Sequence, residues 1–100
     1  MGAGTDRMGQ ADRMEVAERE SQLAAEVRSL ARMLGEAGWA DLDKRFREDA
    51  DRIDSGDRYR LDLLWTDLGR DQWPSEELKV VATRIRAEAE AINRSIYGAG

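Results

Sequence analysis

The chain has 100 residues, of which 41% are hydrophobic and 37% are charged, and its formal net charge is −5. This composition predicts one folded domain, and the acidic balance argues against nucleic acid and anionic membranes as direct partners. Cysteine and histidine are both absent, which excludes disulfides, zinc sites built on Cys or His, and catalysis that needs a histidine base.

The N-terminal residues 1–10 contain three glycines and no hydrophobic segment. We therefore expect a mobile tail there that is not a secretion signal. No apolar run in the chain approaches the roughly 20 residues of a membrane span, and we expect a cytoplasmic protein. Arginine outnumbers lysine 14 to 2, which we interpret as the mark of a GC-rich genome, that of a bacterium or its phage.

Residues 11–34 predict the first helix. Its apolar residues recur at spacings of seven, four, three and four, which is a helical stripe with heptad character. They are Val16, Leu23, Val27, Leu30 and Leu34. A second row of small residues, Ala17, Ala24 and Ala31, lies beside the stripe and favours contact with more than one neighbour. Gly35 is expected to end the helix as its C′ residue.

Three further helices are predicted at residues 39–54, 58–68 and 76–97. Their apolar stripes, in chain order, are Trp39, Leu42, Phe46, Ala50 and Ile53; Leu61, Leu64, Trp65 and Leu68; and Leu78, Val81, Ile85, Ala89, Ile92 and Ile96. Ser75 is positioned as the N-cap of the last helix, and two acidic residues follow it in the first turn. No segment alternates with period two, so no strand is expected.

The predicted fold class is all-α, a compact bundle of about four amphipathic helices with short connections. We expect a single helical domain over residues 11–97, followed by a frayed C-terminal tail at residues 98–100. Because a helical domain this small gains core by association, we also expect a homodimer.

The middle of the chain, from Asp41 to Asp67, holds nine acidic residues. Four pairs of opposite charge lie four residues apart within or beside this segment: Asp41–Arg45, Asp43–Arg47, Glu48–Arg52 and Asp54–Arg58. Each such pair stabilises a helix by about 0.2–0.5 kcal/mol and cancels charge locally. We interpret the segment as a solvated, ion-paired helix face.

The acidic residues left over from these pairs carry an alternative hypothesis. They are Asp49, Asp51, Asp57, Asp62, Asp67 and Asp71. Unpaired carboxylates can imitate phosphates, as in some small phage-encoded inhibitors, anti-CRISPR proteins among them. The chain would then inhibit a complex that handles nucleic acid, with Asp57, Asp62 and Asp67 as its contact residues.

Three acidic residues, Glu20, Asp49 and Glu88, fall close to the apolar stripes. A carboxylate that points inward is costly unless it is paired, so we expect alanines to take the interior and these acids to lie at the boundary. If the acids point inward beside arginines, the chain becomes a small helical enzyme or ligand-binding protein with an Arg/carboxylate cavity.

The connection "GRDQWPSEEL" places Trp73 before Pro74, outside any predicted helix. One interpretation is a staple that folds back on Leu78 or on the end of the preceding helix. The other is a binding anchor that projects from the loop. Trp39 and Trp65 are expected in the core.

No catalytic, nucleotide-binding or metal-binding motif is present, and we expect no cofactor and no metal. The sequence therefore predicts a non-enzymatic protein-interaction module, such as an adaptor, regulator or inhibitor, whose partner is another protein. It would act through a helical face and, in the anchor interpretation, through the Trp73 loop. Tyr59 and Tyr97, at helix ends, are further candidates for partner contact.

Overall fold

The computed structural model contains four helices joined by short connections. They are α1 (Gly2–Glu36), α2 (Ala40–Ser55), α3 (Arg60–Leu68) and α4 (Glu76–Tyr97). The structure describes the backbone of residues 2–97 and the side chains of residues 15–96. Within this part of the chain there is no strand, so the predicted fold class, an all-α bundle, is confirmed.

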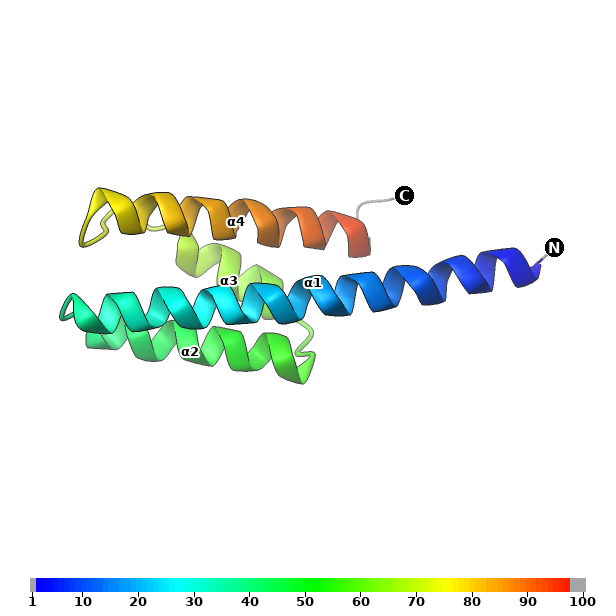
Figure 1. The fold of residues 1–100 in the computed structure, drawn as a ribbon, viewed down its shortest axis with the longest axis horizontal. Coiled ribbons are helices and arrows are strands. Elements are labelled where there is room, and N and C mark those ends of the chain that lie inside the picture. Colours follow the sequence, from blue (N-terminus) through cyan, green and yellow to red (C-terminus); the bar gives the residue numbers. More distant parts are fainter. Residues whose placement is uncertain (1, 98–100) are drawn as a thin grey trace.

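Successive helices run in opposite directions, and the backbone of each packs against two others (Figure 1). α1 lies against α2 and α4, while the short α3 bridges α2 and α4 on the other side. The N-terminal turns of α1 extend beyond the end of α4 (Figure 1). None of the helices in the described part of the chain has the length and apolarity that crossing a membrane requires.

The helix bounds follow the predicted ones except at the N-terminus. The helix predicted at residues 76–97 has those bounds, and α2 and α3 differ from their predictions by one or two residues. α1 begins at Gly2 and not near residue 11, because the helical backbone continues through the expected tail. The division into tail and domain, including the mobility of residues 1–10, stays a prediction, and residues 98–100 lie outside the described part.

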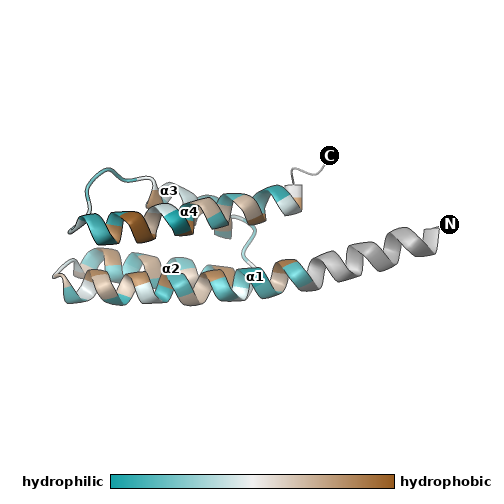
Figure 2. Ribbon diagram, turned by 45° about the horizontal axis from the view of Figure 1, so that its top comes forward, coloured by the Kyte–Doolittle hydropathy of each residue, from teal (hydrophilic) through white to brown (hydrophobic). Residues whose placement is uncertain are grey.

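The core lies between the helices and is built from the predicted stripes. The buried apolar residues are Leu23, Ala24, Val27, Leu30, Ala31, Leu34, Phe46, Ala50, Ile53, Leu61, Leu64, Leu68, Leu78, Ala82, Ile85, Ala89 and Ile92. Hydrophobic and hydrophilic residues interleave along each helix (Figure 2), as burial of one face requires. Ser75 caps α4 as predicted, since its hydroxyl accepts a hydrogen bond from the Leu78 N–H at 3.3 Å.

The turn after α1 is a Schellman motif whose left-handed residue is Gly38, with a φ of 89°. The Gly38 N–H donates to the Gly35 carbonyl at 3.0 Å, and the Trp39 N–H donates to the Leu34 carbonyl at 2.9 Å. The prediction that Gly35 is the C′ residue was therefore wrong. A Cβ at Gly35 would collide with the Asp43 carboxylate of α2, so close helix approach explains that glycine.

Gly38→Ala is expected to lower the free energy of unfolding by about 1 kcal/mol, because alanine must adopt a left-handed φ. The added methyl group meets no atom within 4 Å, so the loss isolates the backbone cost. Urea denaturation followed by circular dichroism measures it. Gly38→Asn is the control, since asparagine tolerates this conformation, and equal losses for the two variants would contradict the assignment.

Candidate functional site

Two of the three acidic residues near the stripes point inward. Glu20 is 8% exposed, and its two oxygens accept hydrogen bonds from Arg60 Nε at 2.6 Å and Nη2 at 2.8 Å. Asp49 is fully buried. The expectation that both lie at the boundary was therefore wrong, because arginines compensate their burial.

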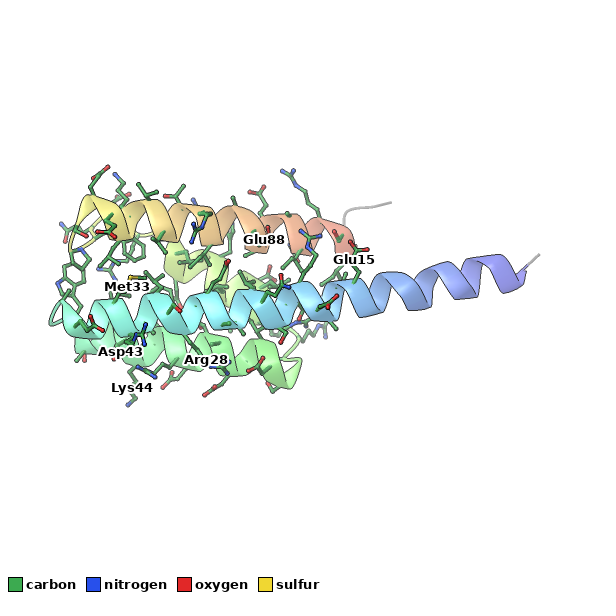
Figure 3. All side chains as sticks on the ribbon, in the orientation of Figure 1. Glu15, Arg28, Met33, Asp43, Lys44 and Glu88 are labelled. Carbon is green, nitrogen blue, oxygen red and sulfur yellow. The ribbon has the colours of Figure 1, made fainter. Side chains whose placement is uncertain are left out.

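Glu88, the third acidic residue, is half-buried on the side of α4 that faces α1 (Figure 3). Its Oε1 accepts a hydrogen bond from Arg19 Nη2 at 3.0 Å. This ion pair therefore joins α1 to α4.

Arg45 of α2 and Arg28 of α1 form ion pairs between helices, in place of most of the predicted pairs four residues apart. Only Asp43–Arg47 forms among the four predicted pairs, all of which lie within the described part of the chain. Arg45 Nη1 instead lies 3.7 Å from an Asp67 oxygen of α3, and Arg28 of α1 binds both Asp51 and Asp54 of α2. These charges therefore join helices and do not form a plain solvated face.

Asp49 and Asp67 form a carboxyl pair between α2 and α3. Asp49 Oδ1 accepts a hydrogen bond from Arg52 Nη1 at 2.6 Å, and Asp49 Oδ2 is buried without a hydrogen-bond partner among the described residues. Burial, then the neighbouring carboxyl of Asp67 with its negative charge, raise the pKa of Asp49 to about 8, although Arg52 and Arg45 act in the opposite direction. At neutral pH Asp49 therefore keeps its proton.

The three aspartates of the phosphate-mimicry hypothesis lie in different environments. Asp57 is exposed, and its Oδ1 accepts a hydrogen bond from the Tyr59 N–H at 2.8 Å in the turn before α3. Asp62 is exposed on α3 and has no ion pair with any described residue. Asp67 is half-buried and faces α2. The structure does not bring the three carboxylates together.

Trp73 lies where the α3–α4 connection meets Phe46 of α2. Its indole stacks on Phe46 with ring centroids 6.2 Å apart and an interplanar angle of 23°. Its Nε1–H donates to the Arg70 carbonyl, just past α3, at 3.1 Å. The half-buried side chain therefore has the geometry of a staple, with Phe46 as its apolar contact, and contact with a partner stays a prediction.

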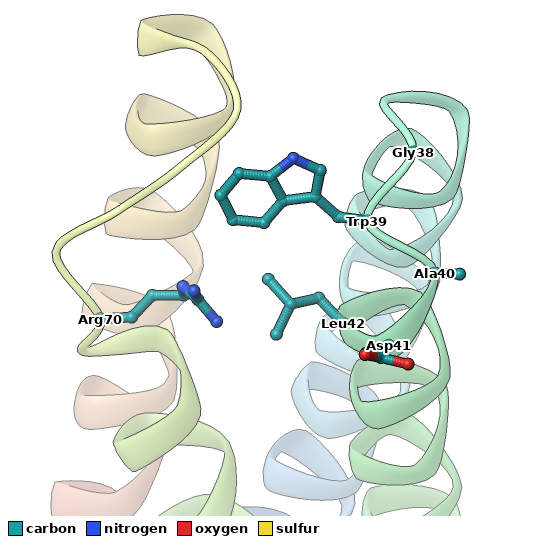
Figure 4. A pocket seen from close by; sticks show the side chains of 6 residues that line it. All are labelled: Gly38, Trp39, Ala40, Asp41, Leu42 and Arg70. Atoms are coloured by element: carbon teal, nitrogen blue, oxygen red, sulfur yellow. The ribbon is translucent and has the colours of Figure 1, made fainter.

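Arg70 links two tryptophans at this end of the bundle. Its Cζ lies 5.4 Å from the Trp39 ring centroid and 5.9 Å from that of Trp73, and its Nε donates to the Gln72 carbonyl at 2.8 Å. An open hollow of about 500 Å³ lies here, lined by Gly38, Trp39, Ala40, Asp41, Leu42 and Arg70 (Figure 4). Because its guanidinium group already contacts two indoles and a carbonyl, we interpret Arg70 as a structural residue that holds Trp39 and the Trp73 loop together.

Trp65 is not in the core, contrary to the sequence prediction. It is 41% exposed, and the Arg86 Cζ of α4 lies 3.9 Å from its ring centroid, a cation–π distance. α3 has five apolar residues among nine, and one face of about two and a half turns buries only part of them. This excess of apolar residues is the signal that could have found the exposed tryptophan.

A groove of about 270 Å³ runs between α3 and α4 beside Trp65. Its lining residues are Leu61, Asp62, Trp65, Ala89, Glu90 and Asn93. The buried Leu61 and Ala89 belong to both the groove and the core. α3 places Asp62 on one rim, and α4 places Glu90 on the other. The groove is therefore lined by apolar and polar side chains together, and Asp62 and Glu90 are the acidic ones.

Two further apolar side chains on or beside α3 are exposed. Tyr59, a predicted contact residue, is 56% exposed, and Leu63 is 41% exposed. The side chain of Tyr97, the other predicted tyrosine, lies outside the described residues. Among the described residues, three of the four large exposed hydrophobic residues therefore lie in α3 or directly before it, and the fourth is Val80 of α4.

No group of three or more acidic side chains that could hold a metal ion occurs among the described residues. No protein-family model matches the chain, and comparisons with curated proteins and with solved structures found no match. The interpretation of the groove and of the carboxyl pair therefore rests on their own geometry.

Asp49→Asn is expected to remove a pH dependence of stability. The folded protein keeps a proton on Asp49 up to about pH 8, whereas an unfolded aspartate releases it at about pH 4. Between these values unfolding releases a proton, so the free energy of unfolding falls as pH rises, by at most about 1.4 kcal/mol per pH unit. The stabilisation is complete below about pH 4 and is lost as pH rises through about 8. The variant should lack this slope.

Urea denaturation between pH 5 and pH 9 measures the effect as a difference between the variant and the wild-type protein. Asp49→Asn should be the more stable protein at the alkaline end, because its amide needs no proton to stay neutral. Asp51→Asn is the matched control on the same helix, since Asp51 is exposed and pairs with Arg28 at the surface. If the free energy of unfolding of wild type and Asp49→Asn varies with pH in parallel, the raised pKa of Asp49 is ruled out.

Proposed function

We propose that this protein is a non-enzymatic protein-interaction module, an adaptor, regulator or inhibitor, that binds a partner protein through α3 and the α3/α4 groove. The observation that supports this most is Trp65, a large aromatic side chain left 41% exposed beside an apolar groove. Tryptophan is enriched among residues that dominate binding energy. Arg86 covers one face of the indole, so its orientation is fixed before a partner arrives.

The charged residues support binding in preference to catalysis. Glu20 is neutralised by Arg60, and Glu88 by Arg19. A hollow of about 250 Å³ between α1 and α4 does contain arginines and carboxylates, but Arg19 and Glu88 within it bind each other. An Arg/carboxylate cavity for a ligand therefore receives little support from this arrangement.

The phosphate-mimicry alternative receives less support than a groove-based partner. Of its three aspartates only Asp62 borders a groove, and Asp67 is engaged by Arg45 and Asp49. A homodimer and a cytoplasmic location are proposed on the sequence alone.

Trp65→Ala is expected to weaken partner binding by more than tenfold, because truncation of a central tryptophan typically costs about 2 kcal/mol or more. The experiment is an affinity pull-down from an extract of the source organism, read by mass spectrometry. Titration of the purified partner then gives the dissociation constants. Circular dichroism checks that each variant is folded.

Val80→Ala is the matched control, because Val80 is 62% exposed on α4 and does not line the groove. Its binding should equal that of the wild-type protein. Trp73→Ala tests the loop separately. A partner lost with Trp73→Ala and retained by Trp65→Ala would refute binding through α3 and move the site to the end of the bundle.

A further inference from the structure

We infer that the α3/α4 groove takes a polypeptide segment with one large apolar side chain flanked by lysine or arginine. This inference rests on the proposed function and adds the chemistry of the partner.

The apolar part follows from the size and lining of the groove. A volume of about 270 Å³ between Leu61, Trp65 and Ala89 admits a single large side chain and not a whole helix face. Leu61 and Ala89 are already buried by the fold, so they form a floor that does not move. An inserted apolar side chain would cover the free face of the Trp65 indole, because Arg86 occupies the other.

The basic part follows from the two rims. Asp62 on α3 has no ion pair with the described residues, so its carboxylate is available to a cation. Among the described residues Glu90 on α4 pairs with Arg94 alone, and Arg94 is largely and Glu90 half exposed, so a partner's cation can replace Arg94 at little cost. The net charge of −5 attracts a basic segment over a longer range.

The same rims disfavour the other occupants. A second copy of the chain docked symmetrically on this groove would bring acidic rims against each other, and like charges in contact oppose association. A nucleic acid would meet Asp62 and Glu90 with its phosphates. A basic and apolar segment is therefore the occupant that this surface complements.

Selection of a random-peptide display library on the immobilised full-length protein tests the inference, with binding of the selected peptides measured by fluorescence anisotropy. We expect selected peptides to share a large apolar residue with Lys or Arg on either side. Asp62→Lys should weaken their binding at least about tenfold, the size of effect found for close charge pairs across an interface. Asp71→Lys makes the same change in net charge at an exposed loop residue and should leave binding within twofold, about the size expected of a distant charge at physiological salt.

The outcomes separate the partner chemistry from the proposed function. Two outcomes would overturn the inference that the bound segment is basic: selected peptides with acidic or neutral flanks, or selected peptides that bind Asp62→Lys as well as wild type. If these peptides still depend on Trp65, binding through α3 and the groove is retained. Equal losses in Asp62→Lys and Asp71→Lys also overturn the inference of a basic segment, since net charge alone would then act. Peptides that ignore Trp65→Ala, or a library that yields no binder, overturn both.

Discussion

The position of α3 is the constraint on which the other features of this protein depend. A helix of nine residues is not stable alone in water, so its stability must come from packing against its neighbours. Leu61, Leu64 and Leu68 bury one face of it between α2 and α4. Its first residue, Arg60, binds Glu20 of α1, and its last turn carries the Asp67 carboxyl that meets α2. The helix is thus held at both ends and along one side.

The polar contacts at the ends of α3 contribute more to the specific orientation of this helix than to the net free energy of unfolding. A buried ion pair gains little over apolar residues of similar size, while loss of one partner leaves a charge uncompensated, at a cost of about 3–5 kcal/mol. A rotation of α3 would separate Arg60 from Glu20 and Asp67 from Asp49 together. We interpret these pairs as the reason why α3 shows its remaining apolar residues in one orientation. The proton on Asp49 serves the same end, because it removes a negative charge from the α2–α3 contact.

Sequence periodicity was sufficient to predict the helices, the bounds of α4, its Ser75 cap and nearly all of the core, because these depend on residues close together in the chain. The burial of Asp49 was not predictable, since Asp67 lies on another helix. The collision at Gly35 also depends on where α2 crosses α1. Trp65 fits the spacing of the α3 stripe, yet α4 presents Arg86 at that position, and only the packing of the two helices reveals this. The candidate groove therefore could not be predicted from the sequence, although Asp62, which lines it, was among the predicted contact residues.

The surroundings of Trp65 argue that its exposure is a specific feature of the fold and not a gap in the packing. Arg86 stacks on the indole although its Nε is buried without a hydrogen-bond partner among the described residues. Gly69 leaves the space that this arginine occupies, because a Cβ there would lie 3.2 Å from Arg86 Nη2. A smaller residue at position 65 would avoid the exposed indole. The fold instead maintains a costly arrangement that holds one aromatic face toward solvent beside an apolar groove. A bound apolar side chain is the component that would complete this arrangement.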